Sequence, residues 1–204
     1  MASADLGVNV GIAGNTSIWH ATGVEKNLNT DGTTDTHTED GTGVAGYTSY
    51  FIEKTLGSRI TIGYEYTPDA LSSDTATNEV LSQDTATREA YTLDKNTVQI
   101  DFDDLHQTYV ALNLNENFYA KYGWASVDVI TNENLATGST YGNTSLDGSM
   151  YGVGYNRSFD NGFFFRAEGV YMDFDSVTLT SNDNTVSLNG LEGASAKLAL
   201  GKSF

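Results

Sequence analysis

Three histidines are the residues of this chain best suited to acid–base chemistry. His20 ends an alternating stretch near the N-terminus, His37 lies in an acidic segment, and His106 follows Asp104 by two positions. A serine–histidine–acid triad needs a histidine held between a hydroxyl and a carboxylate. His106 with Asp104 fits that need best, but spacing in the sequence supplies no hydroxyl. We therefore expect these histidines to have no catalytic role and the protein not to be an enzyme.

Carboxylates crowd the segment around His37. Calcium prefers several carboxylate oxygens, although the spacing here does not match an EF-hand loop. A solvated surface that resists aggregation is the simpler interpretation of the same charges. The chain has no cysteine, no phosphate-binding glycine loop and no zinc-ligand spacing, so we expect no other cofactor. The candidate calcium ligands are Asp31, Asp35, Glu39 and Asp40.

The elements that must position these residues are β-strands, because apolar and polar residues alternate along much of the chain. Between residues 59 and 67, Ile60, Ile62 and Tyr64 alternate with polar or small residues. Within 44–54 aromatic residues occupy both parities, so a strand is expected there without assigned faces. Similar alternation predicts strands within 5–12, 107–114, 118–125, 151–156, 163–174 and 194–204.

Short and long connections alternate along the chain. Tight turns are expected at 55–57, 115–117 and 160–162. Long connections are expected at 20–43, 68–97, 130–147 and 177–187. An up-and-down antiparallel barrel places all of its short turns at one end, so this pattern predicts such a barrel, with about eight strands.

The composition fits one domain, residues 1–204, that spans a membrane with strands. No run approaches the roughly 18 apolar residues of a spanning helix. A soluble lipocalin-like barrel, with its apolar face turned inward, is the structural rival. Three features favour a lipid-facing barrel: small residues on the polar parity, aromatic residues near the strand ends, and the terminal Phe204.

These residues carry a resemblance to a known family. The Gly-x-Gly strand ending at Tyr155, the strand with Arg166 and Glu168, and Phe204 resemble the small outer-membrane barrels that include OmpX, the OmpA membrane domain and the opacity proteins. The resemblance implies a monomer in the bacterial outer membrane, with short periplasmic turns, long extracellular loops and contacts to lipid and lipopolysaccharide. It also implies recognition by the barrel-assembly machinery through Leu198, Leu200 and Phe204, although Lys202 departs from the family pattern.

Charged residues on the inward parity must pair, because burying one charge alone costs several kcal/mol. The resemblance implies a network of ion pairs that fills the lumen. Such a network is either a gate for a narrow pore or a sealed plug, and we favour the plug because an eight-stranded barrel holds little more than its own side chains. The expected members are Arg59, Glu65, Lys121, Arg166, Glu168 and Lys197.

The net charge of the chain is −17, and many of its acidic residues lie in the expected loops. Repulsion there excludes nucleic acid as a partner. Residues 71–79 and 81–89 are near-duplicates, which exposed loops tolerate. We expect a structural or surface-facing function: anchoring in the envelope, or contact of the loops with a surface ligand or phage. A narrow channel or apolar-solute conduit and a lipid-modifying enzyme are the alternatives.

Overall fold

The computed structural model describes residues 7–28, 32–82, 92–134, 140–181 and 184–204. Every regular element in this part of the chain is a β-strand, and none of its residues forms a helix long and apolar enough to cross a membrane. The strands are β1 (Val8–Leu28), β2 (Thr34–Leu56), β3 (Ile60–Ser72), β4 (Ala76–Ser82), β5 (Thr92–Asn113), β6 (Phe118–Asn134), β7 (Thr144–Ser158), β8 (Phe163–Phe174), β9 (Val177–Ser181) and β10 (Asn184–Ser203).

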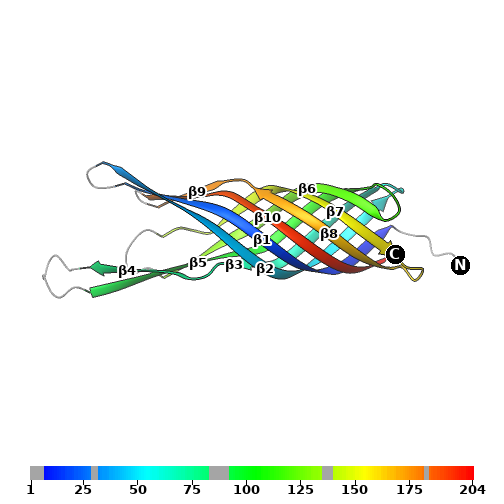
Figure 1. The fold of residues 1–204 in the computed structure, drawn as a ribbon, viewed down its shortest axis with the longest axis horizontal. Helices are drawn as coiled ribbons and strands as arrows, with labels where there is room; N and C mark the ends of the chain where they lie inside the picture. The colour runs from blue at the N-terminus through cyan, green and yellow to red at the C-terminus, as the bar shows by residue number, and fades with distance from the viewer. Residues whose placement is uncertain (1–6, 29–31, 83–91, 135–139, 182–183) are drawn as a thin grey trace.

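The strands form a closed antiparallel barrel (Figure 1). Neighbours follow the order β1, β2, β3, β5, β6, β7, β8 and β10, and β10 pairs again with β1. This gives a ring of eight strands among the described residues, as the sequence predicted. The short strands β4 and β9 pair with β5 and β10 outside the ring.

The two ends of the barrel differ, as the sequence also predicted. The tight turns that follow β2, β5 and β7 lie at one end of the barrel together with the start of β1 and the C-terminus, and we call this end the turn end (Figure 1). Gly57 and Gly162 hold positive φ angles of 66° and 81° in two of these turns, a conformation that side chains other than glycine rarely adopt. The opposite end is called the loop end.

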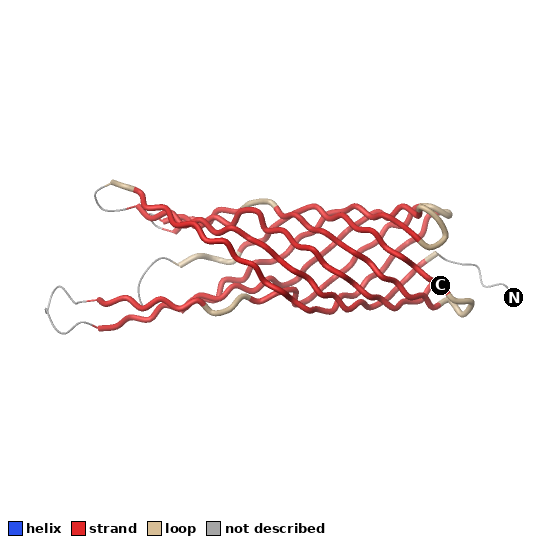
Figure 2. Tube along the Cα trace, viewed as in Figure 1, coloured by secondary structure: helices blue, strands red, loops and turns tan. Residues whose placement is uncertain are grey.

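The expectation of long loops at the loop end is corrected, because much of their length is strand (Figure 2). β1 and β2 remain paired as far as Leu28 opposite Thr34. Thr34, Thr36 and Thr38 favour extended structure through their branched side chains, but polar residues on both faces hide the alternation that marks a strand. The first near-duplicate segment enters β3 and β4, whereas residues 83–89 of the second lie outside the described part.

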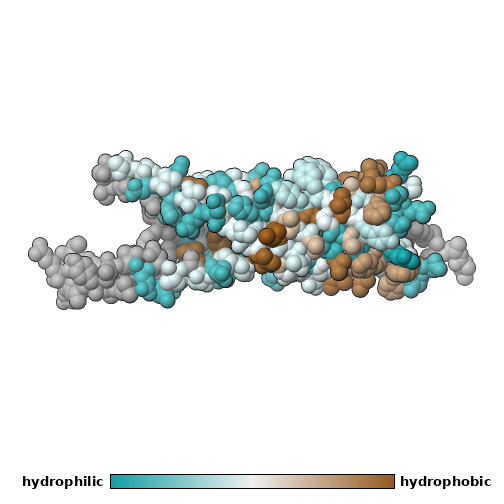
Figure 3. Space-filling view, viewed as in Figure 1, coloured by the Kyte–Doolittle hydropathy of each residue, from teal (hydrophilic) through white to brown (hydrophobic). Residues whose placement is uncertain are grey.

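The apolar parity faces outward around the wall. Ile52 and Ile62 are exposed on neighbouring strands, and Leu198 is 60% exposed on β10. In Figure 3, apolar residues gather toward the turn end, whereas polar residues dominate toward the loop end. This arrangement is opposite to that of a soluble lipocalin-like barrel, whose apolar residues face inward.

Inward aromatic rings lie against glycines of neighbouring strands. A Cβ atom added to Gly63 would lie 2.4 Å from Cζ of Tyr109, the residue opposite it on β5. A narrow barrel therefore accommodates a large ring where its partner has no side chain, which explains why glycine is frequent on the inward parity. The other pairs in register are Phe51 with Gly11, Tyr119 with Gly154, Trp19 with Gly193, and Phe164 with Gly201.

We predict that Gly63→Ala destabilises the barrel by about 1–3 kcal/mol, because the added methyl group must displace the buried Tyr109 ring. Gly14→Ala is the matched control, since a Cβ there meets nothing within 4 Å, and it should change stability by less than about 0.5 kcal/mol. Chemical unfolding in detergent micelles measures both values. Equal losses would contradict the glycine–aromatic packing.

Candidate functional site

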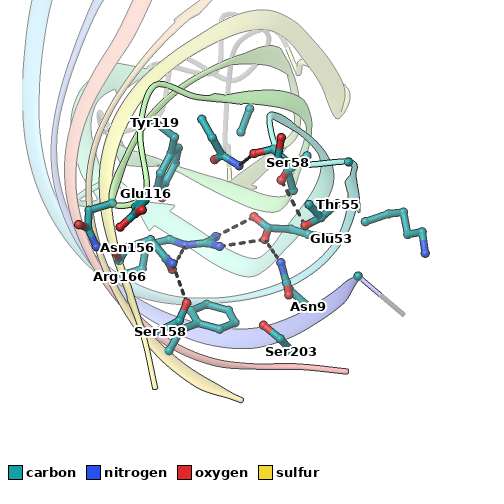
Figure 4. Close-up of a pocket in the computed structure, with 18 of the residues that line it drawn as sticks. Asn9, Glu53, Thr55, Ser58, Glu116, Tyr119, Asn156, Ser158, Arg166 and Ser203 are labelled. Atoms are coloured by element: carbon teal, nitrogen blue, oxygen red, sulfur yellow. Dashed lines mark hydrogen bonds and ion pairs between the residues drawn. The ribbon is translucent and has the colours of Figure 1, made fainter. Parts of the chain in front are cut away.

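A polar cavity opens at the turn end of the barrel. Its volume is about 600 Å³, and asparagine, serine and threonine side chains line most of it. We call this cavity the vestibule. Figure 4 shows Arg166 and Glu53 facing each other in it, with Asn9 and Asn156 beside them. Asn9 donates a hydrogen bond to Glu53, and Arg166 Nε donates one to Asn156 Oδ1. The pair forms the floor of the vestibule.

The Arg166–Glu53 pair begins a layer of buried charges, which we call the charge layer. Nη1 and Nη2 of Arg166 donate to the two Glu53 oxygens at 2.7 and 2.9 Å, a bidentate geometry that is among the strongest for side chains. With the bond from Asn9, Tyr109 donates a fourth hydrogen bond to Glu53, at 2.8 Å. Glu53 is only 3% exposed, so its charge depends on these donors rather than on water.

In the rest of the charge layer, two lysines contact the same carboxylate. Lys121 Nζ and Lys197 Nζ each lie 2.7 Å from Oε2 of Glu168, and Lys197 also lies 2.5 Å from Oε2 of Glu65. Ser49 donates to Glu65 at 2.6 Å, and Tyr119 donates to Glu168. Three cationic and three anionic side chains thus meet with no net charge, which is the condition for burying them together.

The structure brings together five of the six charged residues expected inside the barrel: Glu65, Lys121, Arg166, Glu168 and Lys197. Arg59 is a correction. It lies exposed in the turn between β2 and β3, where the strand alternation that predicted an inward side chain no longer applies. Sequence reasoning also missed Glu53, because the strand within 44–54 had no assigned faces. The proximity of Glu53 to Arg166 depends on a ring closure that no local pattern reveals.

The loop half of the interior is apolar, which the sequence did not predict. Leu105 and Met150 have no exposed surface, and Met172 is 1% exposed. Together with Trp19, Ala70, Ala125, Val127, Val129, Leu146, Val170, Phe174 and Leu191 they form a cluster that we call the apolar plug. The cavity left among its side chains has a volume of only about 10 Å³, enough for one water molecule.

His106 faces outward, beside two tyrosines of β3. Its Nδ1 lies 2.6 Å from the Tyr64 hydroxyl, and its ring stacks on Tyr66 at 5.1 Å between centroids. Tyr66 donates a hydrogen bond to Asp104, which has a positive φ of 51° next to an irregularity in the β5–β6 ladder. Tyr66 thus contacts both members of the candidate pair, stacking on His106 and donating to Asp104.

The proposed calcium ligands do not form a described cluster. Asp31 lies outside the described residues, and no group of three metal-ligating side chains occurs within them. Glu39 contacts His37 at 3.0 Å, and Asp40 accepts a hydrogen bond from Thr22 at 2.6 Å. Asp35 lies farther along β2, opposite Asn27. The calcium site therefore stays a prediction.

Another acidic group gathers on β3, β5 and β6 above the tyrosines. Asp69 lies directly opposite Asp103, and Asp103 lies opposite Asp128 on its other side. Partial burial raises the pKa of the Asp103 carboxyl, and the charges of Asp101 and Asp69 raise it further. Like charges opposite one another destabilise a sheet, so this row of carboxylates has a cost in the isolated chain.

Comparison with solved structures identifies the fold. OprG, an outer-membrane protein of Pseudomonas aeruginosa, has a TM-score of 0.53 and 12% identity over 98% of this chain and 97% of its own. The outer-membrane protein AlkL, determined in lipid bilayers, gives 0.51 and 12% over 100% and 93%. The outer-membrane protease OmpT of Escherichia coli gives 0.52 and 8% over 100% and 99%.

At such identities the similarity concerns the fold and carries no activity over. No protein-family model matches the chain, and no curated protein matches it significantly. The outward apolar wall adds an independent physical argument, because only lipid can cover it all around a closed ring. The chain has the fold of the outer-membrane β-barrels.

The C-terminal residues of this barrel contribute side chains to its outward apolar surface. Leu198, Leu200 and Phe204 are 60%, 62% and 51% exposed. Lys202 lies between them, with its Nζ 4.5 Å from the centroid of the Phe163 ring. A lysine beside aromatic rings suits a membrane boundary, where the amine reaches water. The expected assembly signal is therefore exposed, and its recognition stays a prediction.

We predict that Arg166→Gln destabilises the barrel by about 3–5 kcal/mol, because it leaves the Glu53 carboxylate buried without its cationic partner. Arg59→Gln, the same substitution in an exposed turn, should cost less than about 0.5 kcal/mol. Chemical unfolding in lipid vesicles measures both. A similar loss in the two variants would show that the charge layer contributes nothing specific to stability.

Proposed function

We propose that this barrel is an anchor in the outer membrane whose strand extensions recognise partners at the cell surface. The observation that carries the proposal is the contrast between the two halves of the molecule. The interior is filled, whereas β1, β2, β5 and β10 continue past the ring as paired strands (Figure 1), and β2 is exposed on both faces there. A channel needs an open lumen, whereas side chains fill the lumen here. An adhesive protein needs a surface beyond the membrane, and the strand extensions supply one.

The filled interior supports anchoring over transport. The vestibule ends at Arg166 and Tyr119, and neither Lys121 nor Lys197 lines it. A solute would next have to separate paired charges and then displace the apolar plug. Eight-stranded barrels have interiors just wide enough for their own side chains, so neither obstacle leaves a passage around it.

The charges of the extensions define the partner they suit. Exposed carboxylates along β2 include Glu39 and Asp40, and Asp74 and Glu79 lie on the opposite extension. Lys26 and Lys95 are the exposed lysine side chains on the described extensions, and no exposed arginine is described there. An acidic surface attracts cationic partners and repels polyanions such as nucleic acid. We therefore infer a positively charged partner, in line with a surface-interaction role.

The outer surface of the barrel suits the other partners expected from the sequence, which are lipid, lipopolysaccharide and the barrel-assembly machinery. Its outward apolar residues suit contact with lipid and with the acyl chains of lipopolysaccharide, and the exposed Leu198, Leu200 and Phe204 suit recognition during assembly. Nothing in the described wall requires a second subunit to cover it once lipid is present. A monomer is accordingly the form we propose.

We predict that the purified barrel produces no ion conductance in planar lipid bilayers, because the charge layer and the apolar plug close the lumen in series. A porin reconstituted under the same conditions is the positive control for insertion. Reproducible channel openings by the folded protein would support the channel alternative instead.

We predict that cells displaying the barrel adhere to aminated beads and that trimming the β1–β2 extension weakens adhesion. Gly23 and Glu39 face each other, so an Asn-Gly turn can replace residues 24–38 without altering the ladder below. A second variant, Glu39→Gln with Asp40→Asn, keeps the extension but removes charge, and it should weaken adhesion as well. Carboxylated beads should not bind. Unchanged adhesion in both variants would contradict the proposed role, provided that heat-modifiable gel mobility shows folded protein.

A further inference from the structure

The wall of the barrel opens between β2 and β3 on the loop side. Their ladder runs from Leu56 opposite Ile60 to Tyr50 opposite Tyr66 and ends there. Within the described residues, β2 continues from 49 back to 34 paired with β1 alone, and β3 continues to Ser72 paired with β5 alone. Two strand edges with unpaired backbone groups therefore diverge from one point. Such edges are sites at which another strand can add.

A hollow of about 450 Å³ occupies the space between these edges. A Cβ atom added to Gly43 would lie 3.8 Å from Leu71 Cδ1, so the Leu71 side chain of β3 reaches across the opening toward β2. Pro68 is the single proline of the chain and lies in this part of β3. Proline has no N–H to donate and is therefore confined to the edges of sheets. Its position here agrees with an open edge on β3. We call this hollow the β2–β3 slot; it is lined by Val44, Ala45, Gly46, Asp69, Ala70, Leu71, Ser72, Asp101 and Asp103.

The inner and outer sides of the slot differ in chemistry. On the inner side, Ala45 and Leu71 pack against the apolar plug, which includes Ala70. On the outer side, Asp69 is exposed, and strand alternation places Asp103 on the face opposite Phe102, which packs on the plug. Asp69 and Asp103 oppose each other in the ladder, and no cationic side chain of the slot balances them.

We propose that the β2–β3 slot accepts an extended cationic segment of a partner protein as an added strand. Side chains of a strand point alternately to its two faces, so the segment needs alternating residues. Apolar residues would face the plug, and lysine or arginine would face Asp69 and Asp103. The backbone of the segment would pair with the open edges, which is the mode of recognition known as β-strand addition. This inference rests on the proposed surface-recognition function and names the chemistry of the partner.

Two other occupants fit the slot less well. A second copy of this chain would bring its own β2 edge, and Glu39 and Asp40 on that edge would repel Asp69. An acyl chain would cover Ala45 and Leu71 but would offer no hydrogen bonds to the strand edges and no charge to the aspartates. The cationic strand satisfies the backbone, the apolar inner side and the acidic outer side together.

The test uses the full chain folded in lipid nanodiscs and a labelled, end-capped peptide of four Lys-Val repeats. We expect saturable binding at physiological salt and slower amide hydrogen exchange at residues 42–48 and 67–72. Charge attraction alone would not slow exchange at these edges, so protection there is the signature of strand addition. A Glu-Val peptide should not bind, and a peptide with all lysines before all valines should give no protection.

Asp69→Asn combined with Asp103→Asn should weaken binding of the Lys-Val peptide by about tenfold, the loss expected from two partly exposed charge contacts. Asp147→Asn combined with Asp173→Asn changes the net charge equally on β7 and β8, away from the slot, and should alter affinity by less than about twofold. Equal losses in the two variants, binding without protection, or protection that depends on protein concentration without peptide would each overturn the proposal.

The outcome also separates this proposal from the one on which it rests. If cells adhere to aminated beads but the peptide gives no edge protection, the slot is not the recognition site and the surface role still stands. If both fail in protein that shows heat-modifiable mobility, the surface role falls as well.

Discussion

No backbone N–H or C=O group can go unpaired in hydrocarbon, and the rest of this structure depends on that constraint. A strand that crosses lipid must be paired on both sides, so the pairing of β10 with β1 is obligatory rather than incidental. The same constraint limits where the wall can open. β2 and β3 separate above Tyr50 and Tyr66, and carboxylates such as Asp69 follow at once. On β3 the change from apolar to acidic side chains thus follows directly on the opening of the wall, whereas on β2 the exposed Val44 is still apolar.

A closed ring of eight strands creates a second requirement, because its narrow interior must be filled without clashes or unpaired charges. Glycines opposite aromatic rings meet the first condition, as Gly63 does for Tyr109. The second is met because Tyr109 also donates to Glu53, which binds Arg166. The packing of the wall and the balance of buried charge are therefore one system. A change at a glycine reaches the ion pairs through a single tyrosine.

The sequence predicted the parts of this architecture that depend on local alternation. Period two on β3, β6 and β8 is sufficient to place Glu65, Lys121 and Glu168 inside, because parity alone decides the face of a strand. It failed for Glu53, since Tyr47 and Phe51 face inward while Tyr50 faces outward. Phe51 is tolerated inside because Gly11 lies opposite it, and that fact requires knowledge of the register. Pairing between strands distant in the sequence leaves no local signal.

The apolar plug and the strand extensions were missed for related reasons. Trp19 and Leu105 are apolar residues on the inward parity, where the pattern nearer the turn end predicts small or polar ones. In the extensions both faces meet water, so no alternation is needed and threonine propensity alone favours a strand. The prediction for Arg59 fails for a different reason. Alternation would turn its side chain inward, but alternation applies only within a strand, and Arg59 lies in the turn before β3.

The charge layer also determines what the outer half can do. Glu65 of β3 accepts a hydrogen bond from Ser49 of β2 and pairs with Lys197 of β10. This ties β2 to β3 beside the last rung of their ladder, directly below the point where they diverge. Two edges held apart above such a tie can receive a partner strand without unzipping the wall in lipid. Filling the interior is thus what lets an open edge stand at the surface of a protein whose backbone must stay closed below it.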